Sequence, residues 1–356
     1  MTPEIPRKKT KKIRIGRVVI GGGMPIAVQS MTKCPTTSLK KLSSEIRLLE
    51  EAGCDIVRLG IPDLESARAL RQIKKCTKMP LVADIHFDWR LAVESIKSGA
   101  DKIRINPGNI GDGKKLKAVL AEASAASIPV RIGLNSGSLP KKYLLPGGGF
   151  TPESFAGCAS DYIKLFESMD FTDIVISLKS TDIFMTYRAY RAMAEITRYP
   201  LHIGITESGF GTEGLVRSSI GIGLLLFEGI GDTIRVSLTD TSALEAEAGR
   251  EILKTLNLSS GEPVLISCPT CARREMDVAE LSRLAKKQLK GVKKGITFAV
   301  MGCSVNGPGE ARHADYGVAG GKGKVVIFSR GSAVKTVEKK DIARELKKLV
   351  GEIKNE

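Results

Sequence analysis

Apolar and polar residues alternate along eight short segments within the first 240 residues of the chain. A period of two is typical of β-strands, because successive side chains of a strand point to opposite faces of the sheet. The segments predicted as strands are Ile26–Met31, Ile56–Gly60, Leu81–His86, Lys102–Asn106, Val130–Asn135, Asp173–Lys179, His202–Glu207 and Thr233–Leu238.

Amphipathic segments of helical length separate these strands. They include Leu42–Ala52, Leu64–Lys75, Arg90–Ser98, Lys114–Ala126, Glu153–Ser168, Ile183–Thr197 and Gly214–Phe227. Eight β–α units in about 250 residues predict an α/β fold of the (β/α)8 type, a TIM barrel. An open, doubly wound sheet would place a glycine-rich turn after an early strand, whereas the run Gly21–Gly23 precedes the first one.

The two faces of the predicted strands differ in chemistry. One face is apolar and is expected to pack on the helices, with residues such as Val57, Leu59, Ile103, Ile105 and Ile132. The other face would point into the barrel and is mostly polar. It carries Arg58, Asp84, His86, Lys102, Arg104, Asn106, Arg131, Asn135, Ser177, Lys179, His202, Thr206, Arg235 and Ser237.

Cationic residues inside a barrel need a partner, because burying an unpaired guanidinium or ammonium group costs several kcal/mol. Asp84 and Glu207 are too few to neutralise the cations of the inward face. A multiply charged anion is therefore expected at the carboxyl ends of the strands, where barrel active sites lie. A purely structural, salt-bridged interior is the alternative. Asn106 and Asn135 fit either substrate contacts or turns, since both precede glycine-containing loops.

The sequence predicts two domains, residues 1–258 and residues 259–356. The stretch NLSSGEP reads as a linker, and the strand-like VLISC, ITFAVM and KVVIFS with two helical segments predict a small α+β domain after it. This C-terminal part contains Cys268 and Cys271 in SCPTCAR, then Cys303 and Glu310 in MGCSVNGPGEA. Two cysteines three positions apart and a third from a later loop can converge on one metal centre.

Three interpretations of these cysteines remain open on spacing alone. A structural zinc site would use His313 as its fourth ligand. A redox disulfide between Cys268 and Cys271 would leave Cys303 without a role. An iron–sulfur cluster on the three cysteines would leave one iron for an oxygen ligand, for which Glu310 is the candidate, and a substrate oxygen could replace this carboxylate.

The composition narrows the class of protein. The net charge is +16, but aromatic residues make up only 5% and no basic run is interleaved with them, so base stacking is not favoured. A zinc-stabilised nucleic-acid-binding protein is nevertheless the second hypothesis. No apolar run reaches the roughly 20 residues of a membrane span, and the basic N-terminus is not followed by a signal-type apolar stretch. We expect a cytoplasmic enzyme without membrane or nucleic-acid partners.

Several segments resemble the 4-hydroxy-3-methylbut-2-enyl diphosphate synthase family over essentially the whole chain. They are VQSMT, DIVRLGIP, ADIHF, KIRINPGN, VRIGLNSGS, ISLKSTD, GITESG, SCPTCAR and MGCSVNGPGEA. The resemblance is to the short bacterial form. After VQSMT this chain has KCPTT where the family often has polar Asn and Asp residues, so no role is assigned to Lys33 or Cys34.

This resemblance implies an oxidoreductase of the non-mevalonate isoprenoid pathway. The enzyme reductively opens 2-C-methyl-D-erythritol 2,4-cyclodiphosphate, with reduced flavodoxin or ferredoxin as electron donor. It implies a [4Fe–4S] cluster on Cys268, Cys271, Cys303 and Glu310, and a head-to-tail homodimer. It also implies proton handling by Glu207. The resemblance and the polar inward face of the strands together predict a diphosphate site. Its residues are Arg58, His86, Arg104, Asn106, Arg131, Asn135, Lys179, Thr206, Arg235 and Ser237.

Overall fold

The computed structural model of the chain describes residues 5–111, 113–259, 261–292, 295–303, 313–321 and 323–355. The chain divides into two compact units, Met1–Leu258 and Ser259–Glu356. Each unit has its own hydrophobic core.

The first unit is built on a sheet of eight strands. They are β3 (Ala27–Met31), β4 (Ile56–Gly60), β5 (Leu81–Ile85), β6 (Lys102–Ile105), β7 (Val130–Asn135), β8 (Ile174–Lys179), β9 (His202–Ile203) and β10 (Thr233–Ile234). Their order in the sheet is β8-β7-β6-β5-β4-β3-β10-β9, and every neighbouring pair is parallel. A bridge between Ile176 and Leu201 joins β8 to β9. The predicted (β/α)8 barrel is confirmed.

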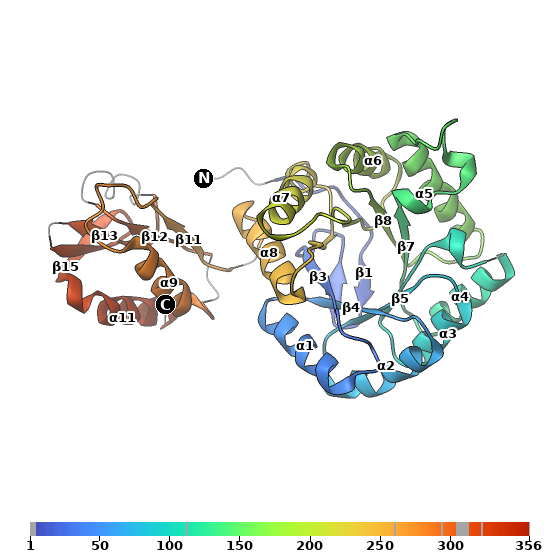
Figure 1. Ribbon diagram of the computed structural model, residues 1–356, viewed down its shortest axis with the longest axis horizontal. Coiled ribbons are helices and arrows are strands. Elements are labelled where there is room, and N and C mark those ends of the chain that lie inside the picture. Colours follow the sequence, from blue (N-terminus) through green and yellow to red (C-terminus); the bar gives the residue numbers. More distant parts are fainter. Residues whose placement is uncertain are drawn as a thin grey trace. The chain divides into compact units, whose positions relative to one another are not determined.

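Helices surround these strands on the outside (Figure 1). They are α1 (Leu39–Glu51), α2 (Leu64–Cys76), α3 (Trp89–Lys97), α4 (Gly113–Ala125), α5 (Pro152–Glu167), α6 (Ile183–Ile196), α7 (Gly211–Phe227) and α8 (Ser242–Thr255). Short 3₁₀ turns, η1 (Pro107–Asn109), η2 (Ser136–Ser138) and η3 (Lys141–Tyr143), lie in the loops. Several helices begin just beyond a strand end with a residue whose side chain accepts a hydrogen bond from the first turn. Asp63 caps α2 in this way, and Asp182 caps α6.

Strands β9 and β10 are shorter than the sequence predicted. Gly204 follows β9 with a φ of +157°, and a side chain there would collide with the carbonyl of Arg235. The backbone nevertheless continues along its neighbours, since Arg235 N donates to Ile203 O at 3.0 Å and Thr206 N to Ser180 O at 3.3 Å. The predicted strand residues therefore keep their place at the barrel wall without regular pairing.

A hairpin that the sequence pattern did not reveal closes the amino end of the barrel. Strands β1 (Ile13–Ile15) and β2 (Val18–Ile20) pair antiparallel. Three residues are too few to establish a period of two. Their apolar side chains form a buried cluster with the first inward residues of the barrel strands. The cluster comprises Ile13, Ile15, Ile20, Ala27, Ile56, Val82 and Val175.

The segment before this hairpin ties the barrel strands together at the same end. Asp232, just before β10, accepts hydrogen bonds from Arg7 at 3.0 Å and Thr10 at 2.9 Å. Lys11 spans the sparsely paired junction of β8 and β9, because its backbone N–H bonds to Arg198 O and its Nζ to Thr172 O at 2.8 Å. The N-terminal segment thereby reinforces the closure of the barrel.

In the described residues, the second unit has a five-stranded sheet and two long helices. Its elements are β11 (Val264–Ser267), α9 (Val278–Leu289), β12 (Thr297–Met301), β13 (Tyr316–Gly321), β14 (Lys324–Ser329), β15 (Ser332–Glu338), η4 (Lys339–Asp341) and α11 (Ile342–Asn355). Strands β11, β12 and β13 are parallel, whereas β14 and β15 are antiparallel. The predicted α+β class is confirmed, but β13 and β15 were missed because glycines and exposed polar residues weaken their pattern.

No helix in the described part of the chain has both the length and the hydrophobicity required to cross a membrane.

Candidate active site

Six cationic side chains project from the strands into the barrel. They are Arg58 on β4, Lys102 and Arg104 on β6, Arg131 on β7, Lys179 on β8 and Arg235 just after β10. Lys102 and Arg131 are fully buried, and the side chains of Arg58 and Arg235 are only 11% and 16% exposed. On β4 the inward side thus carries the apolar Ile56 at the amino end and Arg58 two positions later, whereas β6 begins with Lys102.

Asp84 on β5 is the first counter-charge of this ring. It is fully buried and bonds to Arg58 at 2.6 Å, to Arg104 at 3.2 Å and to His86 Nε2 at 3.2 Å. Burial alone would raise the pKa of Asp84, but Arg58, His86 and Arg104 together hold it well below its usual range. Asp84 is therefore ionised and shared among cations.

Glu245 in the first turn of α8 is the second counter-charge, and the sequence prediction missed it. The residue is 1% exposed, and its carboxylate accepts from Ser30 Oγ at 2.9 Å and from Leu238 N at 3.0 Å. Arg235 lies 3.4 Å away and Lys33 3.5 Å away. Glu207, which was expected to handle a proton at the end of its strand, is exposed and has a φ of +52°.

The cations outnumber these two buried carboxylates, and several of their N–H groups have no partner among the described residues. Such groups are Lys179 Nζ, Arg131 Nε and Nη2, Arg235 Nε and Arg58 Nε. Burial, followed by the charges of Arg235 and Arg131, lowers the pKa of Lys179 well below its usual value. Unpaired buried donors beside an excess of positive charge indicate a site for a multiply charged anion.

The deeper part of the ring contains Lys102 and His202. Lys102 Nζ donates to Gln29 Oε1 at 3.4 Å. His202 Nδ1 lies 2.7 Å from Thr233 Oγ1, while its Nε2 has no partner in the described part of the chain. Burial and then the neighbouring Arg131 lower the pKa of both Lys102 and His202. His202 is therefore neutral and adds no positive charge.

Two glycines make room for the cations. A side chain at Gly133 on β7 would collide with the guanidinium of Arg104, which crosses this position to donate to Gly133 O at 3.0 Å. A Cβ at Gly204 would lie 2.9 Å from Lys179 Nζ. Glycine at both positions allows side chains to lie directly against the backbone of the neighbouring strand.

The remaining predicted residues surround this ring at the strand ends. His86 has a side chain that is 56% exposed, and Thr206, Ser237 and Asn135 are partly exposed. Asn106 is buried, and its amide donates to Ser138 Oγ at 2.9 Å while its Oδ1 accepts from Gly108 N at 3.2 Å. Both ends of the Asn106 side chain therefore serve the turn, whereas Asn135 makes no side-chain capping bond.

The three cysteines lie at the carboxyl ends of neighbouring parallel strands in the second unit. Cys268 follows β11, and its Sγ accepts a hydrogen bond from Gly302 N at 3.1 Å, next to Cys303 after β12. A hydrogen bond to Cys271 and the charges of Cys271 and Cys303 raise the pKa of Arg273, so this side chain lies near both thiols. The pKa of Cys271 is lowered in return, which favours its thiolate.

The surroundings of the three cysteines have some of the features of an iron–sulfur cluster site. Backbone N–H donors to sulfur are typical of iron–sulfur sites, and a Cβ at Gly302 would lie only 3.4 Å from Cys268 Sγ. Among the described residues, however, no group of three or more His, Cys, Asp or Glu side chains is placed to hold a metal ion. Glu310 lies outside the described residues, and His313 is exposed.

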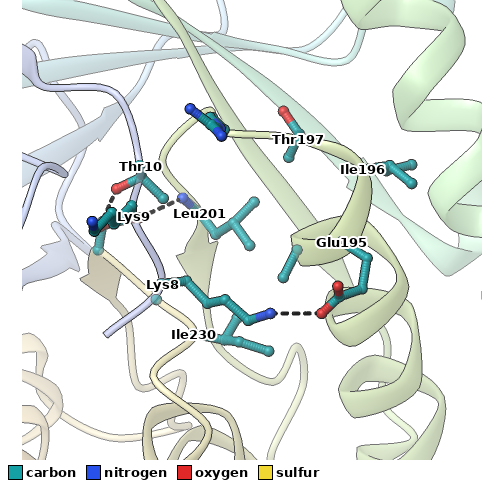
Figure 2. Close-up of a pocket in the computed structure, with 12 residues that line it drawn as sticks. Lys8, Lys9, Thr10, Glu195, Ile196, Thr197, Leu201 and Ile230 are labelled. Atoms are coloured by element: carbon teal, nitrogen blue, oxygen red, sulfur yellow. Dashed lines mark hydrogen bonds and ion pairs between the residues drawn. The ribbon is translucent and has the colours of Figure 1, made fainter. Parts of the chain in front are cut away.

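The amino end of the barrel contains a separate cavity of about 350 Å³ (Figure 2). Lys8, Lys9 and Thr10 of the N-terminal segment line one side and Glu195 and Thr197 the other, with an ion pair of 2.6 Å between Lys8 and Glu195. Active sites of TIM barrels lie at the opposite end, where the cation ring is. We therefore do not assign this cavity to the active site.

Comparison with known families covers both units. Residues 10–250 match the GcpE TIM-barrel domain, and residues 264–352 match the GcpE protein C-terminal domain. The chain belongs to the GcpE family. The resemblance seen in the sequence motifs is thereby confirmed.

Two relatives illustrate the similarity within the GcpE family. A 4-hydroxy-3-methylbut-2-en-1-yl diphosphate synthase (flavodoxin) from Thermodesulfovibrio yellowstonii is 49% identical over 342 residues, which cover 96% of this chain and 98% of the relative. One of the same name from Caldicellulosiruptor saccharolyticus is 50% identical and covers 95% of this chain and 97% of the relative. Both units of this chain thus have counterparts in these synthases.

Two solved structures are similar to part of the chain. Dihydropteroate synthase from Stenotrophomonas maltophilia covers 70% of this chain and 97% of its own, with 14% identity and a TM-score of 0.52. 3-Dehydroquinate dehydratase from Geobacillus kaustophilus covers 72% of this chain and 100% of its own, with 15% identity and a TM-score of 0.51. At such identities the likeness shows the TIM-barrel fold alone.

Proposed function

We propose that this GcpE-family protein converts 2-C-methyl-D-erythritol 2,4-cyclodiphosphate into 4-hydroxy-3-methylbut-2-enyl diphosphate, as a step of the non-mevalonate isoprenoid pathway. Relatives of nearly equal length carry the name of this synthase. The observation in the fold that best supports the proposal is the buried cation ring, whose Lys179 amine and Arg131 guanidinium lack partners among the described residues. A diphosphate supplies the missing negative charge.

The roles of the ring residues follow from their chemistry. Arg58, Arg104, Arg131 and Arg235 offer planar N–H pairs that match phosphate oxygens, and Lys179 acts as a point charge. His86, Asn135, Thr206 and Ser237 at the strand ends are proposed to contact the rest of the substrate, and Asn106 to hold its loop in place. Removal of one substrate oxygen as water requires two electrons and two protons. Glu207, exposed beyond β9, is proposed to handle a proton.

The proposed cofactor is a [4Fe–4S] cluster held by Cys268, Cys271 and Cys303, with Glu310 as the fourth ligand. The cluster supplies one-electron reduction when it is bound. The protein supports it with the Gly302 N–H bond to Cys268 and with the positive charge of Arg273 beside the thiols. Reduced flavodoxin is the proposed donor, since the relatives carry flavodoxin in their name. A cytoplasmic homodimer completes the proposal.

Anaerobic reconstitution tests this function. Protein loaded with iron and sulfide is expected to be brown, to show a thiolate-to-iron absorption band and to form the allylic diphosphate when supplied with reduced flavodoxin. Cys303→Ser should lose the band and the activity. Colourless protein with stoichiometric zinc, or a brown protein that leaves the cyclic diphosphate unchanged, would contradict the proposal.

A further inference from the structure

A groove lies on the second unit between α9 and the segment that leads into α11. Its volume is about 480 Å³. The lining residues come from α9, from the two residues before it and from residues 339–343. The apolar members Met276, Leu281 and Ile342 are buried, with exposures of 4%, 7% and 7%, and belong to the core of this unit. The groove therefore has an apolar floor.

The rim of the groove is basic. Arg283, Lys287, Lys339 and Lys340 line it and are all exposed. Of the two carboxylates in the lining, Asp277 caps α9 by accepting from Glu280 N at 2.9 Å. The whole unit contains 19 basic and 11 acidic residues, so it carries half of the net charge of +16 in little more than a quarter of the chain. An apolar floor within a charged rim is the usual composition of a protein docking surface.

The groove borders the cysteine loops. Met276 of the groove packs against Gly320, because a Cβ placed at Gly320 would lie 2.6 Å from Met276 Sδ. The same Cβ would lie 2.8 Å from the carbonyl oxygen of Gly302, so Met276 and this carbonyl both border Gly320. Val278, in the first turn of α9, and Cys268 Sγ both lie close to Gly302, with distances of 2.5 Å and 3.4 Å from a Cβ placed there. One end of the groove therefore lies beside the thiols that would hold a redox centre.

From these three observations we propose that this groove is the docking surface for the electron donor, a reduced flavodoxin that presents a carboxylate-rich face. This inference rests on the proposed function, because it assumes that electrons enter through the second unit. The basic rim attracts and orients the acidic partner, and the apolar floor next to the cysteines provides the contact. Opposite charge on the two surfaces makes association fast and sensitive to salt.

Charge reversal on the rim tests this surface in the reconstituted holoenzyme. The variant K339E/K340E should raise the KM for reduced flavodoxin about tenfold or more at low ionic strength, and high salt should reduce the difference from the wild type. The control K347E/K348E makes the same change on exposed residues of α11 outside the groove. It should change the KM less than about threefold.

A non-protein reductant separates this inference from the proposed function. Reduced methyl viologen does not need a docking surface, so the wild type and K339E/K340E should turn over equally with it. Loss of viologen-driven turnover in the rim variant, or equal effects of the rim and control variants with flavodoxin, would overturn the docking site. A wild type that is inactive with both reductants would instead refute the proposed function.

Filling the floor provides a second test without a change in charge. Ala343→Gln places a longer side chain in the groove and should weaken flavodoxin binding several-fold, whereas Ala279→Gln on the exposed side of α9 should not. Sedimentation of both variants shows whether a second copy of the chain, and not flavodoxin, occupies the groove. If Ala343→Gln dissociated a dimer and left flavodoxin binding unchanged, the groove would be an interface between copies of the chain and the proposal would be wrong.

Discussion

The two ends of the barrel interior are built from the same strands but follow opposite physical rules. At the amino end, Ile56 and Val82 pack with the hairpin residue Ile15, and this layer is apolar and closed. Two positions further along the same strands, Arg58 and Asp84 face a ring of buried cations with unpaired N–H groups. Burial of apolar side chains in the first layer stabilises the fold. The buried, unpaired cations of the second layer lower the stability of the fold, and a bound anion would compensate for this cost.

The largest expected effect comes from the ring. Lys179→Met removes an ammonium group that has no partner in the described protein, and we expect turnover of the cyclic diphosphate to fall by about 10² to 10³. The free energy of unfolding should not decrease, because the lost group was buried and unpaired. Steady-state assays and denaturant unfolding measure the two quantities. The exposed Lys164→Met is the matched control, and a large stability loss in Lys179→Met would contradict the comparison.

The amino-end layer should respond in the opposite way. Ile56→Ala leaves a cavity in the apolar cluster and should lower the free energy of unfolding by about 2–5 kcal/mol. Activity of the remaining folded protein should be nearly unchanged, since no ring contact is lost. Ile196→Ala, at a 59% exposed position, should change stability by less than about 0.5 kcal/mol. Equal losses in the two variants would show that the hairpin cluster does not stabilise the barrel.

Glu245 tests how the ring is held in place. Glu245→Gln keeps the size of the side chain but removes the charge beside Arg235, so we expect KM to rise about tenfold with a smaller effect on kcat. The comparison variant is Glu247→Gln on the exposed side of the same helix, which should behave as wild type. If Glu245→Gln lowered only the thermal stability, Glu245 would have a structural role and would not position Arg235.

The smallest expected effect is a change in the number of protons bound to Lys179. The pKa of Lys179 is lowered in the fold, so between that value and its ordinary 10.5 the unfolded chain binds more protons and stability rises with pH. A bound diphosphate raises the pKa again, so binding in this window should take up a fraction of a proton. Calorimetry of pyrophosphate binding in two buffers of different ionisation enthalpy measures this uptake. Proton release on binding would contradict the sign, and Lys179→Met should reduce the uptake.

The sequence allowed prediction of the fold class, both units and the inward cations, because a period of two places every second residue of a strand on one face. It did not reveal Glu245, since a helix residue in the turn after the last strand has no periodic relation to the strand residues it contacts. The exposure of Glu207 could not be predicted either, because the chain beyond Gly204 leaves the regular strand and Glu207 has a positive φ. Hydrogen bonds of Asn106 depend on the loop conformation, which a local pattern does not specify.

We propose that the unpaired cations form a prepared anion site, as opposed to a structural salt-bridge network. Thermal unfolding of wild type and Arg131→Met, with and without inorganic pyrophosphate, tests it directly. We predict that the variant melts at or above the temperature of the wild type when no anion is present, and that pyrophosphate stabilises only the wild type. A variant that melts several degrees lower and still gains the full stabilisation from pyrophosphate would contradict this account.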